Sequence, residues 1–124
     1  VCDRHNKKYY EKYKKWCDDY FFLPHRNEPR GIGGIFFDYK KNNFEKDFKF
    51  VRDVGITFQM IFNNIIKKKI NKHWTLKDKE KQFIKRGRYT EFNLLYDRGT
   101  KFGLQTGGNV EGILMSLPPI AKWK

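Results

Sequence analysis

The sequence predicts an α+β fold, in which an antiparallel β-sheet is flanked by α-helices. Two segments, 9–20 and 44–65, carry large apolar residues at spacings of three and four, which is typical of amphipathic helices. A third segment, 89–97, alternates between two faces as a half-buried strand does. The chain has 124 residues, which is the size of one domain.

Local signals predict where the helices begin and end. Asn43 is placed to cap the N-terminus of the helix over 44–65, and the lysines at 67–69 suit its negative C-terminal end. The motif Thr75-Leu76-Lys77-Asp78 resembles a capping box, which predicts a short helix from there to about Lys85. The apolar face of the first helix is made of Tyr9, Tyr13, Trp16 and Tyr20.

The remaining segments are predicted to be strands and turns, followed by one short helix. Strands are expected at 34–38, 89–97 and 101–105, with turns at 97–100 and 106–109. After the second turn, Asn109 is a suitable N-cap, and Pro118-Pro119 is a suitable stop. The helix between them is predicted from the spacing of Val110, Ile113, Leu114 and Leu117.

Charge and composition narrow the class of protein. There are 27 Lys and Arg against 14 Asp and Glu, a net charge of +13, but 20 of the cations are Lys, which we interpret largely as compositional drift. The seven Arg carry more information, because a planar guanidinium suits carboxylates and phosphates. No apolar run approaches the ~20 residues of a membrane helix, and no signal peptide is recognised. Cys2 and Cys17 form no CxxC, which favours a reduced, intracellular chain.

Metal, nucleophile and nucleotide motifs are weak. His5, His25 and His73 are far apart in the sequence and lack HExxH spacing. Nothing near Cys17 resembles a nucleophile elbow, so we interpret it as a packing residue. The glycines at 31–34 lack the GxGxxG pattern of dinucleotide sites.

Two groups of residues are typical of an anion-binding site. Arg26 and Arg30 flank a proline-stiffened loop that also contains His25; the alternative is a surface loop in which Glu28 pairs with one arginine. Gly107, Gly108 and Asn109 precede a helix, where backbone N–H groups can hold a carboxylate; the alternative is an ordinary turn with a helix C-cap. Lysines interleaved with aromatics leave a basic nucleic-acid-binding module as an alternative function.

Longer runs of the sequence resemble one family. They are YKKWCDDYFF (13–22), HRNE (25–28) with RGIGGIFFD (30–38), RGRY (86–89) with EFNLLYDRGTKFGLQTGG (91–108), and ILMSLPP (113–119). Together they resemble the oxygen-dependent coproporphyrinogen-III oxidase family, and the resemblance is weakest over 39–85. Members are more than twice as long, so the chain is expected to be a single partial domain over 1–124, the C-terminal half of the family's domain. The resemblance then puts the catalytic residues upstream and none in this chain.

The resemblance implies oxidative decarboxylation of two propionates of coproporphyrinogen III to vinyl groups, giving protoporphyrinogen IX, with O₂ as co-substrate and no organic cofactor. It further implies a homodimer whose antiparallel sheet is sandwiched between helices, no nucleic-acid partner, and a cytoplasmic enzyme of bacterial type, with a mitochondrial or plastid compartment left open. The region 86–119 resembles the part associated with dimer contacts and the cleft.

Five residues correspond to substrate-binding positions of the family: Arg26, Arg30, Gly107, Gly108 and Asn109. Many members carry Arg or Lys near Asn109, so the uncharged side chain here leaves backbone N–H groups as donors. His25 corresponds to a histidine treated as a metal ligand in bacterial members. Because the resemblance implies a reaction that requires no divalent metal, we interpret His25 instead as a hydrogen-bonding residue of the cleft wall.

Overall fold

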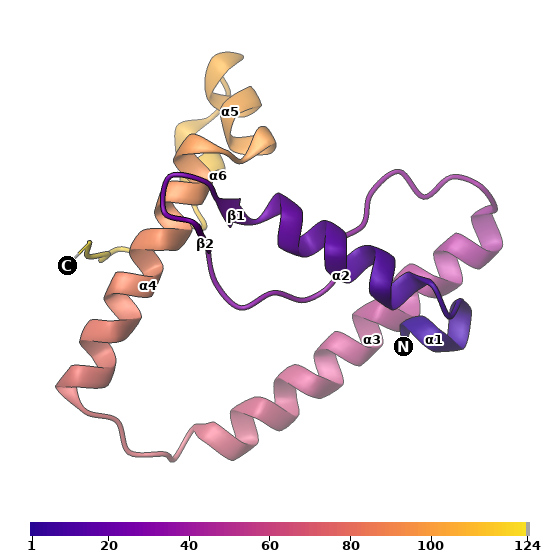
Figure 1. Cartoon of the computed structure of the whole chain (residues 1–124), viewed down its shortest axis with the longest axis horizontal. Helices are drawn as coiled ribbons and strands as arrows, with labels where there is room; N and C mark the ends of the chain where they lie inside the picture. The colour runs from indigo at the N-terminus through magenta and orange to yellow at the C-terminus, as the bar shows by residue number, and fades with distance from the viewer. Residues whose placement is uncertain (124) are drawn as a thin grey trace. The chain divides into compact units, whose positions relative to one another are not determined.

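The computed structural model describes residues 1–123 and confirms the α+β class (Figure 1). It is mostly helical, with one two-stranded antiparallel sheet. In chain order the elements are α1 (Cys2–His5), α2 (Tyr9–Tyr20), β1 (Phe22–Leu23), β2 (Glu28–Pro29), α3 (Phe44–Lys69), α4 (Leu76–Leu95), α5 (Arg98–Gln105) and α6 (Val110–Leu114). They form two compact units, one from 1–19 with 34–73 and the other from 20–33 with the residues from Trp74 onward.

The first unit is built on α2 and α3. The bounds of α2 are those predicted, and α3 begins as predicted, because the Asn43 side chain accepts a hydrogen bond from the Lys46 N–H. The core of this unit is formed by Cys2, Tyr13 and Phe50, which are all buried. Beyond this core the apolar side chains of α3 are exposed, among them Phe58, Ile61, Phe62 and Ile65.

The strand predicted at 34–38 is wrong. This segment is irregular, and the Phe36 N–H donates to the Tyr13 carbonyl of α2 at 3.0 Å instead of to a neighbouring strand. Its apolar residues pack on a helical core, with Ile35 and Phe37 lying against the Tyr13 and Phe50 cluster. The β-rich composition therefore reflects packing, because no strand of residues 1–123 pairs with this segment to complete a ladder.

The second unit consists of the β1–β2 hairpin and α4 to α6. Phe22 pairs with Pro29 and Leu23 pairs with Glu28, so the prolines stand at the base and in the turn of a short hairpin. Leu23 is fully buried, and Phe92 of α4 is 1% exposed. These two side chains form the apolar centre of the unit.

The strands predicted at 89–97 and 101–105 are also wrong, because both segments are helical. The capping box is present, since Thr75 and Asp78 bond reciprocally, but α4 continues past Lys85 to Leu95. The turn predicted at 97–100 is the start of α5, where the Asp97 side chain accepts from the Thr100 N–H at 2.7 Å. The Asn109 cap is confirmed by its bond from the Glu111 N–H, although α6 ends at Leu114.

Between residues 1 and 123, no helix is both long and apolar enough to cross a bilayer. Cys2 and Cys17 are both free and buried, which confirms Cys17 as a packing residue.

Candidate anion-binding site

The hairpin of the second unit carries His25, Arg26 and Arg30, the first group of residues predicted to bind an anion. The Arg26 N–H donates to the Leu23 carbonyl, and the Arg30 N–H donates to the Phe21 carbonyl, which closes the loop at both ends. Asn27 has a φ of 52°, a left-handed conformation that asparagine tolerates in tight turns. The loop therefore holds His25, Arg26 and Arg30 on a rigid frame.

Glu91 of α4 binds two residues of this loop. Arg26 donates from Nε and Nη2 to the two carboxylate oxygens of Glu91, and His25 Nε2 lies 3.0 Å from Glu91 Oε2. The Glu91 side chain is only 10% exposed. The bidentate bond from Arg26, with help from His25, lowers the pKa of Glu91 to about 2. The charge of Arg26 is thus neutralised within the protein.

His25 has a hydrogen-bond partner at each ring nitrogen. Because the Glu91 carboxylate only accepts hydrogen bonds, His25 Nε2 carries a proton, and Nδ1 lies 2.8 Å from the Tyr96 hydroxyl. Both ring nitrogens are therefore engaged. Nowhere in residues 1–123 do three His, Cys, Asp or Glu side chains gather at a position that could hold an ion.

Glu28 pairs with α4 and with neither arginine of its own loop. It accepts from Arg88 Nε, and Lys85 Nζ lies 3.5 Å from its other oxygen. These bonds, that of Arg88 above all, lower the pKa of Glu28 below its ordinary value. The predicted alternative of a pairing between Glu28 and Arg26 or Arg30 is therefore not what occurs.

Arg30 faces a cavity of about 680 Å³. Its guanidinium carbon lies over three aromatic rings, at 4.1 Å from the centroid of Phe21, 4.8 Å from Tyr89 and 5.0 Å from Phe92. No carboxylate of the described chain forms an ion pair with Arg30. The lining of the cavity comprises Glu28, Pro29, Arg30, Gly31, Ile32, Gln82, Lys85, Arg86 and Tyr89.

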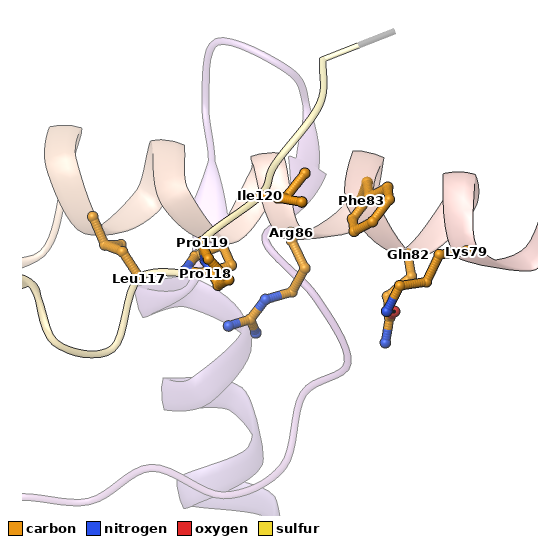
Figure 2. Close-up of a pocket in the computed structure, with 8 residues that line it drawn as sticks. All are labelled: Lys79, Gln82, Phe83, Arg86, Leu117, Pro118, Pro119 and Ile120. Atoms are coloured by element: carbon orange, nitrogen blue, oxygen red, sulfur yellow. Dashed lines mark hydrogen bonds between the residues drawn. The ribbon is translucent and has the colours of Figure 1, made fainter.

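A second cavity, of about 540 Å³, lies on the same helix and shares Gln82 and Arg86 with the first (Figure 2). Figure 2 shows Arg86 and Gln82 extending to the same side of α4, with Pro118 and Pro119 beside the Arg86 side chain. The rest of its lining is Lys79, Phe83, Leu117 and Ile120. The two cavities together combine cationic groups with an apolar wall, as expected of a site for an amphipathic anion.

Gly107, Gly108 and Asn109, the second group of residues predicted to bind an anion, lie in the turn that follows helix α5. The Gly108 N–H donates to the Gly103 carbonyl at 2.9 Å, and the Gly107 N–H donates to Leu104 at 3.4 Å. Gly107 has a φ of 71°, which favours glycine. Asn109 is exposed and caps α6. The hydrogen bonds described for this turn remain within α5 and α6, whereas those of His25 and Arg26 lead to α4.

Sequence reasoning did not identify Glu91, Arg86 or Tyr89. A signal was present, because Arg86, Tyr89 and Arg88 belong to the RGRY run, and their spacing places Arg86 and Tyr89 one helical turn apart. Assigning this region to a strand concealed that relation.

The second unit thus combines a short hairpin with a cavity that is lined by several cationic side chains, as in proteins whose ligands are organic anions. Comparison with known proteins identifies the family. The family model described as coproporphyrinogen III oxidase matches residues 1–124. The chain belongs to the coproporphyrinogen III oxidase family. This leaves the nucleic-acid alternative without support.

Individual relatives agree with the family match. The chain is 60% identical to the oxygen-dependent coproporphyrinogen-III oxidase of Rickettsia rickettsii (strain Sheila Smith), over 99% of this chain and 44% of the relative. Proteins of the same name from Rickettsia bellii (strain OSU 85-389) and Rickettsia akari (strain Hartford) are 59% and 58% identical over the same shares. The chain thus spans less than half the length of these curated relatives.

Proposed function

We propose that the complete protein containing this chain converts coproporphyrinogen III to protoporphyrinogen IX. For each of two propionates, the side chain loses CO₂ and a hydride equivalent to become a vinyl group, and O₂ takes up the two electrons with protons to give H₂O₂. The observation that carries this proposal is the identity of 58–60% to proteins named oxygen-dependent coproporphyrinogen-III oxidase, which extends over 99% of the chain.

Within that enzyme we propose that this segment binds substrate carboxylates and that the catalytic residues lie outside it. Arg30 is supported most directly, because it lines a cavity and no carboxylate of residues 1–123 neutralises its guanidinium. Arg26 acts through its bond to Glu91, which holds the loop that carries Arg30. Gly107, Gly108 and Asn109 form a second contact with the substrate, supported by the family resemblance and by the exposure of the turn. Because the Gly107 and Gly108 N–H groups donate to carbonyls of α5, this contact runs through the Asn109 N–H.

The proposed reaction uses O₂ and no organic cofactor. In the structure Glu91 and Tyr96 lie within hydrogen-bond distance of the two His25 ring nitrogens. We therefore assign His25 a hydrogen-bonding role in the wall of the site.

We further propose that residues 1–124 are part of a larger domain and that the complete protein is a homodimer. The exposed apolar side chains of α3, such as Phe58, Phe62 and Ile65, support this, because exposed apolar surface of this kind is normally covered. On its own the chain should lack turnover. The source of the relatives in Rickettsia supports a cytoplasmic enzyme of bacterial type.

The test of the function is an assay of the complete protein with coproporphyrinogen III, in air and under anaerobic conditions. We expect protoporphyrinogen IX to form in air without added flavin or nicotinamide, and turnover to stop without O₂. Undiminished anaerobic turnover, or no turnover in air by a folded protein, would refute the proposal.

Replacing Arg30 by alanine should raise the substrate KM of the complete enzyme about 10-fold to 100-fold. A charge-assisted hydrogen bond to a carboxylate contributes about 1.5–3 kcal/mol. Lys67→Ala and Lys68→Ala are the controls, because these exposed lysines at the end of α3 should change KM little. Similar effects at all three positions would show that diffuse charge, and not the Arg30 fork, holds the substrate.

A further inference from the structure

The Tyr89 ring contacts two guanidinium groups of the candidate site. The guanidinium carbon of Arg30 is 4.8 Å from the centroid of the Tyr89 ring, and that of Arg86 is 4.4 Å from the same centroid. Because both groups contact one ring, the two guanidinium carbons lie within about 9 Å of each other. Arg86 and Tyr89 are fixed relative to each other, since they stand one turn apart on α4.

The two guanidiniums share an excess of positive charge. The other loop and α4 charges nearby are paired, Arg26 with Glu91 and Arg88 with Glu28. Arg30 and Arg86 form no ion pair with any Asp or Glu of residues 1–123, whereas Lys85, which lines the same cavity, is paired with Glu28. The hydrogen bond with Ser116, together with the nearby charges of Arg30 and Arg86, lowers the pKa of Tyr89. Two unneutralised cations at this spacing favour the binding of more than one negative group.

Arg86 also joins this cationic pair to an apolar surface. It lines both cavities, and on the side of the second cavity its neighbours are Leu117, Pro118 and Pro119 (Figure 2). A ligand that reaches both guanidiniums can therefore lay an apolar body against the prolines. This combination fits an amphipathic polycarboxylate better than inorganic phosphate, which has no apolar part to bury.

We propose that Arg86 is a second carboxylate-binding residue, and that Arg30 and Arg86, which contact the same Tyr89 ring, bind two different carboxylates of one tetrapyrrole. This rests on the proposed function for the identity of the ligand. Arg86 then makes binding depend on the number of free carboxylates, because one guanidinium suffices for a monocarboxylate whereas the pair requires two.

The experiment is a fluorescence titration of the complete protein with coproporphyrin III, the flat oxidised form of the proposed substrate, and with its tetramethyl ester in the same detergent. Arg86→Gln should lower the affinity for coproporphyrin III about 10-fold to 100-fold and leave the affinity for the ester unchanged. Arg86→Lys should lose less affinity for coproporphyrin III, because lysine keeps the positive charge but cannot form two parallel hydrogen bonds as the guanidinium does. Lys81→Gln is the matched control, since it removes one exposed cation of α4 that lines neither cavity.

The outcomes separate this inference from the proposed function. Unchanged affinity of Arg86→Gln for coproporphyrin III, equal losses for Arg86→Gln and Lys81→Gln, or equal losses for acid and ester would each overturn the role of Arg86. None of these depends on turnover. If the wild-type protein binds the acid through Arg86 but produces no protoporphyrinogen IX, the proposed reaction fails and the two-carboxylate site stands. If Arg86→Gln does not fold, Arg86→Lys provides the same comparison of acid with ester.

Discussion

Replacing Gly87 by alanine should displace the segment that follows α6 and lower the unfolding free energy of the complete protein. A Cβ at Gly87 would stand 2.3 Å from the carbonyl oxygen of Lys122 and 3.3 Å from its carbonyl carbon. Both are backbone atoms and cannot turn away as a side chain could. Overpacking of this kind costs about 1–3 kcal/mol, and here it exceeds the gain of up to about 1 kcal/mol that alanine brings to a helix.

Displacement would also alter the second cavity. Lys122 holds the segment on α4 through its N–H bond to the Phe83 carbonyl at 3.1 Å, and the same segment supplies Pro118 and Pro119 to the cavity wall. We therefore expect Gly87→Ala to raise the substrate KM as well as to lower the urea midpoint. Gly55→Ala is the matched control, because no atom lies within 4 Å of a Cβ at this exposed position of α3, and it should stabilise the protein slightly. If Gly87→Ala also stabilised the protein, the packing of the segment on α4 would be wrong.

Replacing Glu91 by glutamine should lower the unfolding free energy by about 3 kcal/mol at neutral pH. The folded protein lowers the pKa of Glu91 from its ordinary 4.5 to about 2, and this difference corresponds to about 3 kcal/mol. The substitution leaves Arg26, which is 29% exposed, without its carboxylate, and removes the charged partner of His25. The loop that carries Arg30 should loosen, so that KM rises together with the loss of stability.

The effect of Glu91 on stability should depend on pH in a defined window. Because the pKa is lower in the folded protein, the contribution is complete above about 4.5 and is lost as the pH falls toward 2. Urea unfolding of the complete protein should therefore show wild type and Glu91→Gln converging over this range. Glu11→Gln, at an exposed position of α2, should follow the wild-type curve. A constant difference between wild type and Glu91→Gln from pH 7 to 2 would show that Glu91 is not held ionised by Arg26 and His25.

The helix starts could be predicted because the bonds that make them are local. Asn43 bonds to a backbone N–H three residues away, and Thr75 and Asp78 bond to each other across the same interval. Both partners of each such bond lie within four consecutive residues, so the local sequence is enough to predict where these helices begin. The loop between Pro24 and Pro29 was predicted for the same reason, but the two short strands that it joins were not.

The element type of 89–97 could not be decided in this way. Tyr89, Phe92 and Tyr96 fit the three and four spacing of a helix, while the same stretch also alternates as a strand does. Two distant contacts favour the helix: Phe92 is buried with residues of the hairpin such as Phe21, whose ring lies 5.2 Å away, and Gly87 packs against Lys122. Neither contact is visible in a local pattern.

For the site, the sequence by itself determined the kind of chemistry: a stiff loop with two arginines that suit an anion, and motifs of the coproporphyrinogen oxidase family. The tertiary structure decided which arginine is available. Glu91, which lies 65 positions from Arg26, neutralises that residue, while Arg30 stays over the Tyr89 ring with Arg86 on the same ring. A guanidinium that is paired with a carboxylate of its own protein has less net charge and fewer N–H donors to offer a ligand, and that pairing depends on residues brought together by folding.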